Sequence, residues 1–107
     1  MIVNFNLDAK KIERVAGDFS YVTVQLVKNQ CAKVLRFSVV YNGSPSLMRK
    51  VAADFFWNDY AAELIDFSDM TCCFDKVYSI YRYCAMREGR SYIKKRDSKN
   101  FFNFFQK

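Results

Sequence analysis

The chain has 107 residues, of which 51% are hydrophobic and 18% aromatic, and it carries a net charge of +6 without a single histidine. This composition predicts one globular domain over residues 1–107, and because apolar runs are short and no secretory signal is evident, we expect a cytoplasmic protein without a membrane span. The missing histidine excludes imidazole-dependent catalysis, and isolated glycines with no CxxC pair argue against phosphate loops and zinc sites, so we expect no cofactor.

The N-terminal half predicts strands around one short helix. Residues 1–7 begin with an apolar, alternating run typical of a strand, and residues 8–19 repeat apolar side chains at the helical spacing of three and four. Residues 21–28 alternate with Val22, Val24 and Leu26 on one side and Thr23 and Gln25 on the other, and residues 33–41 alternate too, with Leu35, Phe37, Val39 and Tyr41 opposite Arg36, Ser38 and Val40. With a short polar connection between them, these two segments predict an antiparallel hairpin with one buried face.

Two longer helices are predicted next. Ser44 followed by Pro45 is a typical helix start, and the helix that it opens needs a kink or break near Asn58 to reconcile its apolar face with an acidic row. Residues 70–88 carry the most regular apolar repeat of the chain, and Gly89 follows as the expected helix end. We therefore expect residues 70–88 to be the last helix and part of the core.

The predicted order is β-α-β-β-α-α, an α+β fold with a small antiparallel sheet packed against helices. Its start is ferredoxin-like, and the third helix is an addition to that pattern. We expect residues 90–107 to form a basic and aromatic C-terminal extension, with residues 91–95 as a short edge strand and residues 100–107 as a helical turn or a docked tail.

The same β-α-β-β-α order begins an RNA-recognition domain, in which aromatic side chains on the first and third strands stack on bases. Phe5 and either Phe37 or Tyr41 occupy comparable strands here. However, the glycine-containing signature of such a third strand is absent, and the row containing Phe37 and Tyr41 has the spacing of a core face.

Positive charge is concentrated in the last third of the chain. Residues 70–107 carry nine basic and three acidic groups, a surplus of +6, which equals the net charge of the whole chain. Basic and aromatic residues together are typical of surfaces that bind nucleic acid or a nucleoprotein complex, in a non-enzymatic role. The predicted binding residues are Lys76, Arg82, Tyr83, Arg87, Arg90, Lys94, Lys95, Arg96 and Lys99.

Two alternatives remain open at this point. In the first, the chain is a stoichiometric inhibitor or adaptor of viral or mobile-element type, which binds a host protein with an acidic or apolar groove through exposed aromatic side chains. The candidate anchors are Trp57, Tyr60, Phe101, Phe102, Phe104 and Phe105, although the four phenylalanines equally suit packing onto the domain. In the second, Asp59, Glu63 and Asp66 hold Mg²⁺ in a metal-dependent nuclease, whereas their spacing is also that of an ordinary solvated helix face.

Overall fold

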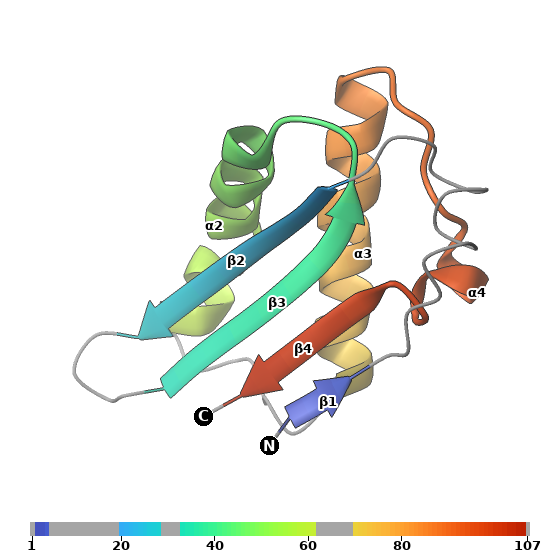
Figure 1. The fold of residues 1–107 in the computed structure, drawn as a ribbon. Helices are drawn as coiled ribbons and strands as arrows, with labels where there is room; N and C mark the ends of the chain where they lie inside the picture. Colours follow the sequence, from blue (N-terminus) through green and yellow to red (C-terminus); the bar gives the residue numbers. More distant parts are fainter. Residues whose placement is uncertain (1, 5–19, 29–32, 62–69, 107) are drawn as a thin grey trace.

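A computed structural model describes residues 2–4, 20–28, 33–61 and 70–106, with side chains for residues 21–27, 34–57 and 71–104. Four strands form an antiparallel sheet, and the two long helices cover one face of it (Figure 1). This arrangement confirms the predicted α+β class. The described elements are β1 (Ile2–Asn4), β2 (Ser20–Lys28), β3 (Lys33–Tyr41), α2 (Pro45–Ala61), α3 (Met70–Arg87), α4 (Lys95–Ser98) and β4 (Phe102–Gln106).

The predicted hairpin is present as β2 and β3, which pair antiparallel with Leu26 opposite Leu35. Val22 and Val24 are buried while Thr23 and Gln25 are exposed, so the alternation in the sequence corresponds to the two faces of the sheet. Phe37 and Tyr41 lie in the buried row of β3, at 0% and 1% exposure. They therefore belong to the core and offer no base-stacking platform of the RNA-recognition type.

The C-terminal phenylalanines correct the prediction for residues 100–107. Phe102, Phe104 and Phe105 belong to β4, which lies between β1 and β3 in the sheet order β1-β4-β3-β2 and pairs with β3 from Leu35–Gln106 to Val39–Phe102. Phe101, Phe102 and Phe104 have no exposed surface. The last residues of segment 90–107 thus supply an inner strand of the sheet and part of the core.

The start of α2 follows its sequence signals, whereas its length does not. The Ser44 Oγ accepts a hydrogen bond from the Leu47 amide at 3.3 Å, and the Ser44 carbonyl accepts one from Met48, which confirms Ser44 as the N-cap. The helix then continues without interruption through Asn58 to Ala61. Of the predicted kink or break near Asn58, the break is therefore wrong, and the kink stays a prediction.

Helix α3 confirms the prediction for residues 70–88 within one residue. It ends in a Schellman motif, in which the amide of Arg90 donates to the Ala85 carbonyl at 2.7 Å and the amide of Gly89 donates to Met86 at 3.2 Å. Gly89 has φ of 65°, the left-handed conformation that glycine adopts without steric cost. The inner face of α3 is buried through Cys73, Phe74, Val77, Ile80, Tyr81, Cys84 and Ala85.

Residues 90–94 run back along α3 without regular secondary structure, which corrects the predicted edge strand at 91–95. Their place is fixed by Ile93, which is 1% exposed. The Tyr78 hydroxyl donates to the Ile93 carbonyl at 3.0 Å, and the Tyr81 hydroxyl accepts a hydrogen bond from the Ile93 amide at 2.9 Å. Two buried tyrosines of α3 thus take the hydrogen-bonding role that a neighbouring strand would have.

Several predictions lie outside the described residues. The helix expected over residues 8–19 is one, and the acidic row of Asp59, Glu63 and Asp66 is another, as are the side chains of Tyr60 and Phe105. Among the described helices, none is both long and apolar enough to cross a bilayer.

Candidate functional site

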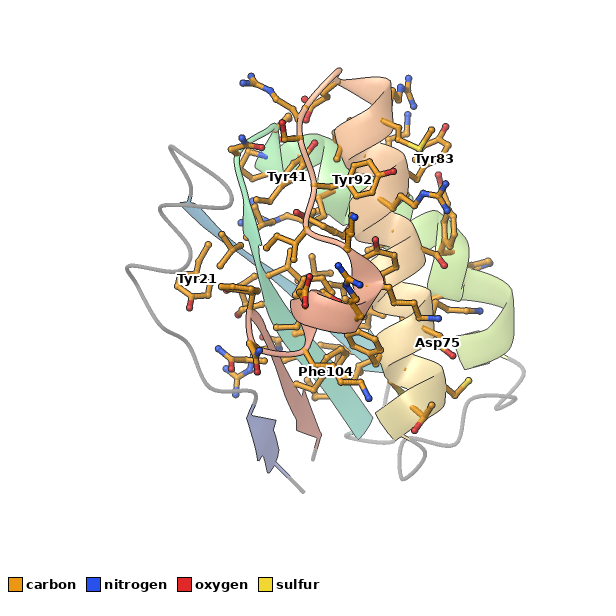
Figure 2. The ribbon with its side chains drawn as sticks, turned by 90° about the vertical axis from the view of Figure 1, so that its right-hand side faces the viewer. Tyr21, Tyr41, Asp75, Tyr83, Tyr92 and Phe104 are labelled. Atoms are coloured by element: carbon orange, nitrogen blue, oxygen red, sulfur yellow. The ribbon has the colours of Figure 1, made fainter. Side chains whose placement is uncertain are left out.

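The side of α3 that faces away from the sheet is the main candidate site. Figure 2 shows Tyr83 and Asp75 on the right, the strands of the sheet to the left of α3, and Tyr21 on the far left, across the sheet. Helix α2 borders this side of α3 through Phe55, and segment 90–99 borders it through Tyr92 and Lys95. We call the exposed side chains here the outer surface of α3: Phe55, Asp75, Ser79, Arg82, Tyr83, Met86, Tyr92, Lys95, Arg96 and Lys99.

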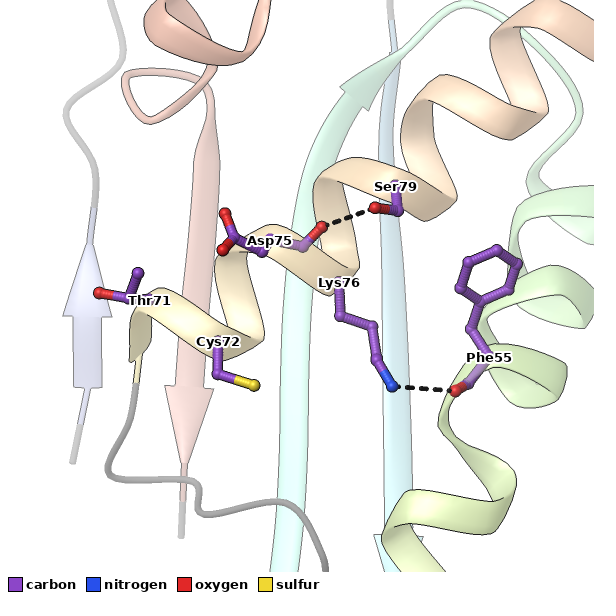
Figure 3. Close-up of a pocket in the computed structure, with 6 residues that line it drawn as sticks. All are labelled: Phe55, Thr71, Cys72, Asp75, Lys76 and Ser79. Atoms are coloured by element: carbon purple, nitrogen blue, oxygen red, sulfur yellow. Dashed lines mark hydrogen bonds between the residues drawn. The ribbon is translucent and has the colours of Figure 1, made fainter.

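Three shallow hollows follow one another across this surface and share lining residues. The first, of about 470 Å³, lies between α2 and α3 and is lined by Phe55, Thr71, Cys72, Asp75, Lys76 and Ser79 (Figure 3). The second, of about 370 Å³, is lined by Phe55, Tyr78, Ser79, Arg82, Tyr83, Met86 and Lys95. The third, of about 500 Å³, is lined by Thr71, Phe74, Asp75, Lys95, Arg96 and Lys99.

Aromatic side chains and cations lie next to one another on the outer surface of α3. The rings of Phe55 and Tyr83 lie 6.2 Å apart across the two helices, at 38% and 46% exposure. The Arg82 guanidinium lies 5.9 Å from the centre of the Tyr92 ring, and Tyr92 is itself 38% exposed. The outer surface therefore leaves π surface and positive charge in solvent side by side, a combination suited to cation–π and stacking contacts.

The predicted cations do not all have the same environment. Lys76 is only partly exposed, and its ammonium donates to the Phe55 carbonyl at 3.4 Å and lies 5.6 Å from the Phe56 ring. It therefore helps to hold α2 on α3, as Figure 3 shows. Lys95 and Arg96 are exposed but lie beside acids, with Lys95 bound to Asp75 at 2.7 Å and Arg96 to Asp97 at 3.6 Å.

Other predicted residues are exposed but lie apart from the hollows. Arg87, Arg90 and Lys94 are exposed, and none of them lines one of the three hollows described above. Trp57 is 70% exposed on α2 and also lies outside those hollows. The structure thus keeps Arg82, Tyr83, Lys95, Arg96 and Lys99 together.

Three of the proposed aromatic anchors are excluded by burial. Phe101, Phe102 and Phe104 are fully enclosed, and the rings of Phe102 and Phe104 lie 5.7 and 6.4 Å from that of Phe74. Alternation along β4 directs Phe102 and Phe104 to the same face of the sheet, where α3 covers them. A partner protein has no access to these rings in the folded chain.

The sequence reasoning missed Phe55 and Tyr92 as surface residues. Phe55 falls in the apolar repeat of α2, yet 38% of it remains exposed because α3 packs beside it rather than over it. Tyr92 directly precedes the buried Ile93. Because neighbouring side chains of an extended segment point to opposite sides, an inward Ile93 is the signal that predicts an outward Tyr92.

A second polar cluster joins the end of α3 to the turn before α2. The Tyr41 hydroxyl donates to the Glu88 carboxylate, which also accepts the Ser44 amide at 3.0 and 3.1 Å. These hydrogen bonds lower the pKa of Glu88, whereas burial, followed by the bond to Glu88, raises the pKa of Tyr41. A side chain at Gly43 would collide with Tyr41 and Glu88, so this cluster has a structural role.

Metal-binding groups are not gathered in the part of the chain with described side chains. No three cysteine, aspartate or glutamate side chains there come close enough to hold an ion. Cys73 and Cys84 are buried thiols, and burial raises the pKa of Cys84 to about 11. The nuclease alternative, which depends on the acidic row of α2 and the residues after it, stays a prediction.

Comparison of the chain with protein-family models, with curated proteins and with solved structures finds no match in any of the three. A functional proposal therefore rests on the chain's own residues.

Proposed function

We propose that this chain is a non-enzymatic binding protein that docks on nucleic acid, alone or within a nucleoprotein complex, through the outer surface of α3. The observation that carries the proposal is the gathering of exposed cations and exposed aromatic rings on that surface. Phosphate neutralisation supplies most of the affinity of such surfaces, and aromatic rings add contacts to bases.

The charge balance of residues 70–100 supports an anionic partner. This segment holds eight basic side chains and three acidic ones. Each acid already has a partner, since Asp75 binds Lys95, Asp97 binds Arg96, and Glu88 binds Tyr41 and the Ser44 amide. Positive charge is thus in excess along this segment, and a polyanion is the partner that this excess favours.

The proposal is tested by fluorescence anisotropy with labelled oligonucleotides over a range of salt concentrations. We expect log K to fall linearly with log salt, with a slope of about 0.7 to 0.9 per phosphate contacted. The double variant Arg82→Gln/Arg96→Gln should weaken binding and reduce that slope by about 1 to 2. Undetectable binding at low salt, or a slope that the variant leaves unchanged, would refute the proposal.

A matched control removes the same charge elsewhere. Arg49 and Lys50 are exposed on α2 and line none of the three hollows, and Arg49 donates to the Thr23 carbonyl of the edge strand β2 at 3.4 Å. The double variant Arg49→Gln/Lys50→Gln should bind like the parent chain apart from a small long-range electrostatic loss. Equal losses in the two double variants would indicate attraction by net charge alone, without a defined surface.

Trp57 favours a second candidate function, that of a stoichiometric inhibitor or adaptor which binds a host protein. Trp57 has 70% of its surface in solvent, and covering this apolar surface with a partner would be favourable in free energy. Exposed tryptophans are typical of interface hot spots. This candidate predicts that one protein co-purifies with the chain in equal amount after nuclease treatment and is lost from Trp57→Ala. Retention of that partner by Trp57→Ala would exclude Trp57 as the anchor.

A further inference from the structure

We infer that the second hollow of the outer surface, lined by Phe55, Arg82, Tyr83, Met86 and Lys95, takes an unstacked nucleotide, and that the ligand is therefore single-stranded nucleic acid. This inference rests on the proposed function and adds the class of nucleic acid to it. We call this hollow the nucleotide hollow.

The walls of the nucleotide hollow expose apolar and aromatic side chains to solvent. Met86 is 59% exposed, Tyr83 46% and Phe55 38%, and the Phe55 and Tyr83 rings stand at 54° to one another. In a duplex the flat faces of the bases are stacked on each other and only their edges are accessible. Contacts with ring faces and a thioether therefore require bases that have left the stack.

The cations of the nucleotide hollow are placed to receive the backbone of that nucleotide. Arg82 lines the hollow and lies over the Tyr92 ring, and among the described residues it forms no ion pair. Lys95 also lines the hollow and is bound to Asp75, with both side chains about half exposed, at 54% and 50%. An ion pair at that exposure is worth at most about 1 kcal/mol, so a phosphate can take the place of Asp75.

The surface around the hollow is held in place before any ligand arrives. Segment 90–99 contributes Tyr92 and Lys95, and it is fixed on α3 by two hydrogen bonds of the Ile93 backbone, whose carbonyl accepts from Tyr78 and whose amide donates to Tyr81. A strand that binds here orders itself but does not have to order this part of the protein. Preorganisation of this kind reduces the entropy lost on association, which suits a small site with few contacts.

The closing experiment compares single-stranded DNA, single-stranded RNA and duplex DNA of about 12 nucleotides, a length within the usual site sizes of single-strand binders. At one low salt concentration we expect either single strand to bind at least about tenfold more tightly than the duplex. Tyr83→Ala and Phe55→Ala should each weaken single-strand binding by about 5- to 100-fold, the loss of one stacked base, without changing the salt slope.

Tyr21→Ala serves as the control, because Tyr21 is 44% exposed and lies across the sheet from Tyr83 (Figure 2). Its binding should equal that of the parent chain. As a measurement that needs no variant, a strand with a single 5-iodouracil should photocrosslink to the peptide that contains Tyr83.

The outcomes separate the inference from the function that it refines. Single-strand preference together with a Tyr83 crosslink supports both. Salt-dependent binding that favours the duplex, or that Tyr83→Ala and Phe55→Ala leave unchanged, overturns the nucleotide hollow and leaves the proposed function standing. Absence of binding to all three oligonucleotides overturns both.

Discussion

Tyr81→Phe is the substitution that tests most directly how the outer surface of α3 is supported. Tyr81 is buried, with 2% of the residue exposed, and its hydroxyl accepts a hydrogen bond from the Ile93 amide at 2.9 Å. Phenylalanine keeps the ring and its contact with Phe102 at 5.4 Å but removes the acceptor. The Ile93 amide, in a residue that is 1% exposed, then has neither this partner nor ready access to water.

The expected loss follows from that unsatisfied donor. A buried amide without a hydrogen-bond partner costs about 1 to 3 kcal/mol of folding free energy. For a domain of this size, 1 kcal/mol corresponds to roughly 4 °C in midpoint temperature, so we expect Tyr81→Phe to unfold about 4 to 12 °C below the parent chain. Thermal and urea denaturation followed by circular dichroism measure both quantities.

The control makes the same chemical change on the same helix without burial. Tyr83 is 46% exposed, and Tyr83→Phe should change the midpoint by no more than about 1 °C, since an exposed hydroxyl exchanges one water contact for another. If Tyr81→Phe is as stable as Tyr83→Phe, the hydrogen bond to Ile93 does not anchor segment 90–99. If both variants lose the same stability, the loss belongs to the hydroxyl group itself and not to the contact.

Three further predictions concern the core, the Glu88 cluster and alkaline pH. Phe104→Ala should lower the free energy of unfolding by about 3 to 5 kcal/mol, because it opens a cavity among buried rings, and urea denaturation measures this. The pKa of Glu88 is lowered in the folded state, so the ionised carboxylate stabilises the fold at pH values above 4.5, the ordinary pKa of a glutamate, and this contribution is lost as pH falls. Glu88→Gln should therefore make the free energy of unfolding less dependent on pH in the acid range. Burial raises the pKa of Cys84 to about 11 and of Tyr81 to about 12, and it also raises the pKa of Tyr41. Because these groups lose their protons at lower pH in the unfolded chain than in the folded one, the free energy of unfolding should fall as pH rises from 9 through 12.

Each of these predictions has an opposite result that would refute its reasoning. A Phe104→Ala chain with unchanged stability would mean that β4 is not part of the core. An acid limb that Glu88→Gln leaves intact would show that other carboxylates produce it. Constant stability up to pH 12, measured by the urea midpoint, would mean that the raised pKa values of the three buried groups do not arise from folding.

The local elements were predictable because their signals lie within a few neighbouring residues. Alternation placed the hairpin and its buried face, from Val22 to Tyr41, and helical spacing placed α3 and its outward side. Caps followed the same rule, since Ser44 begins α2 and Gly89 ends α3 through bonds to residues no more than five positions away. Arg82 and Tyr83 were candidates for binding on this basis alone.

The two misses that matter most for the site depend on contacts between distant parts of the chain. Phe102–Gln106 has the composition of an apolar tail that docks on the domain, and only its pairing with β3, more than 60 residues earlier in the sequence, makes it a strand. In the same way, the partial exposure of Phe55 depends on how α3 packs beside α2. Loop closure over such distances leaves no periodic signal in the residues themselves.

The sequence by itself determined the secondary structure of the hairpin and the two long helices, the charge excess of the last third, and the absence of histidine chemistry. Tertiary structure alone decided which aromatic residues remain in solvent. It buried three of the C-terminal phenylalanines and left Phe55, Tyr83 and Tyr92 exposed around Arg82 and Lys95. The reason is physical: a side chain's chemistry sets what it can bind, but only packing against distant residues decides whether a ligand reaches it.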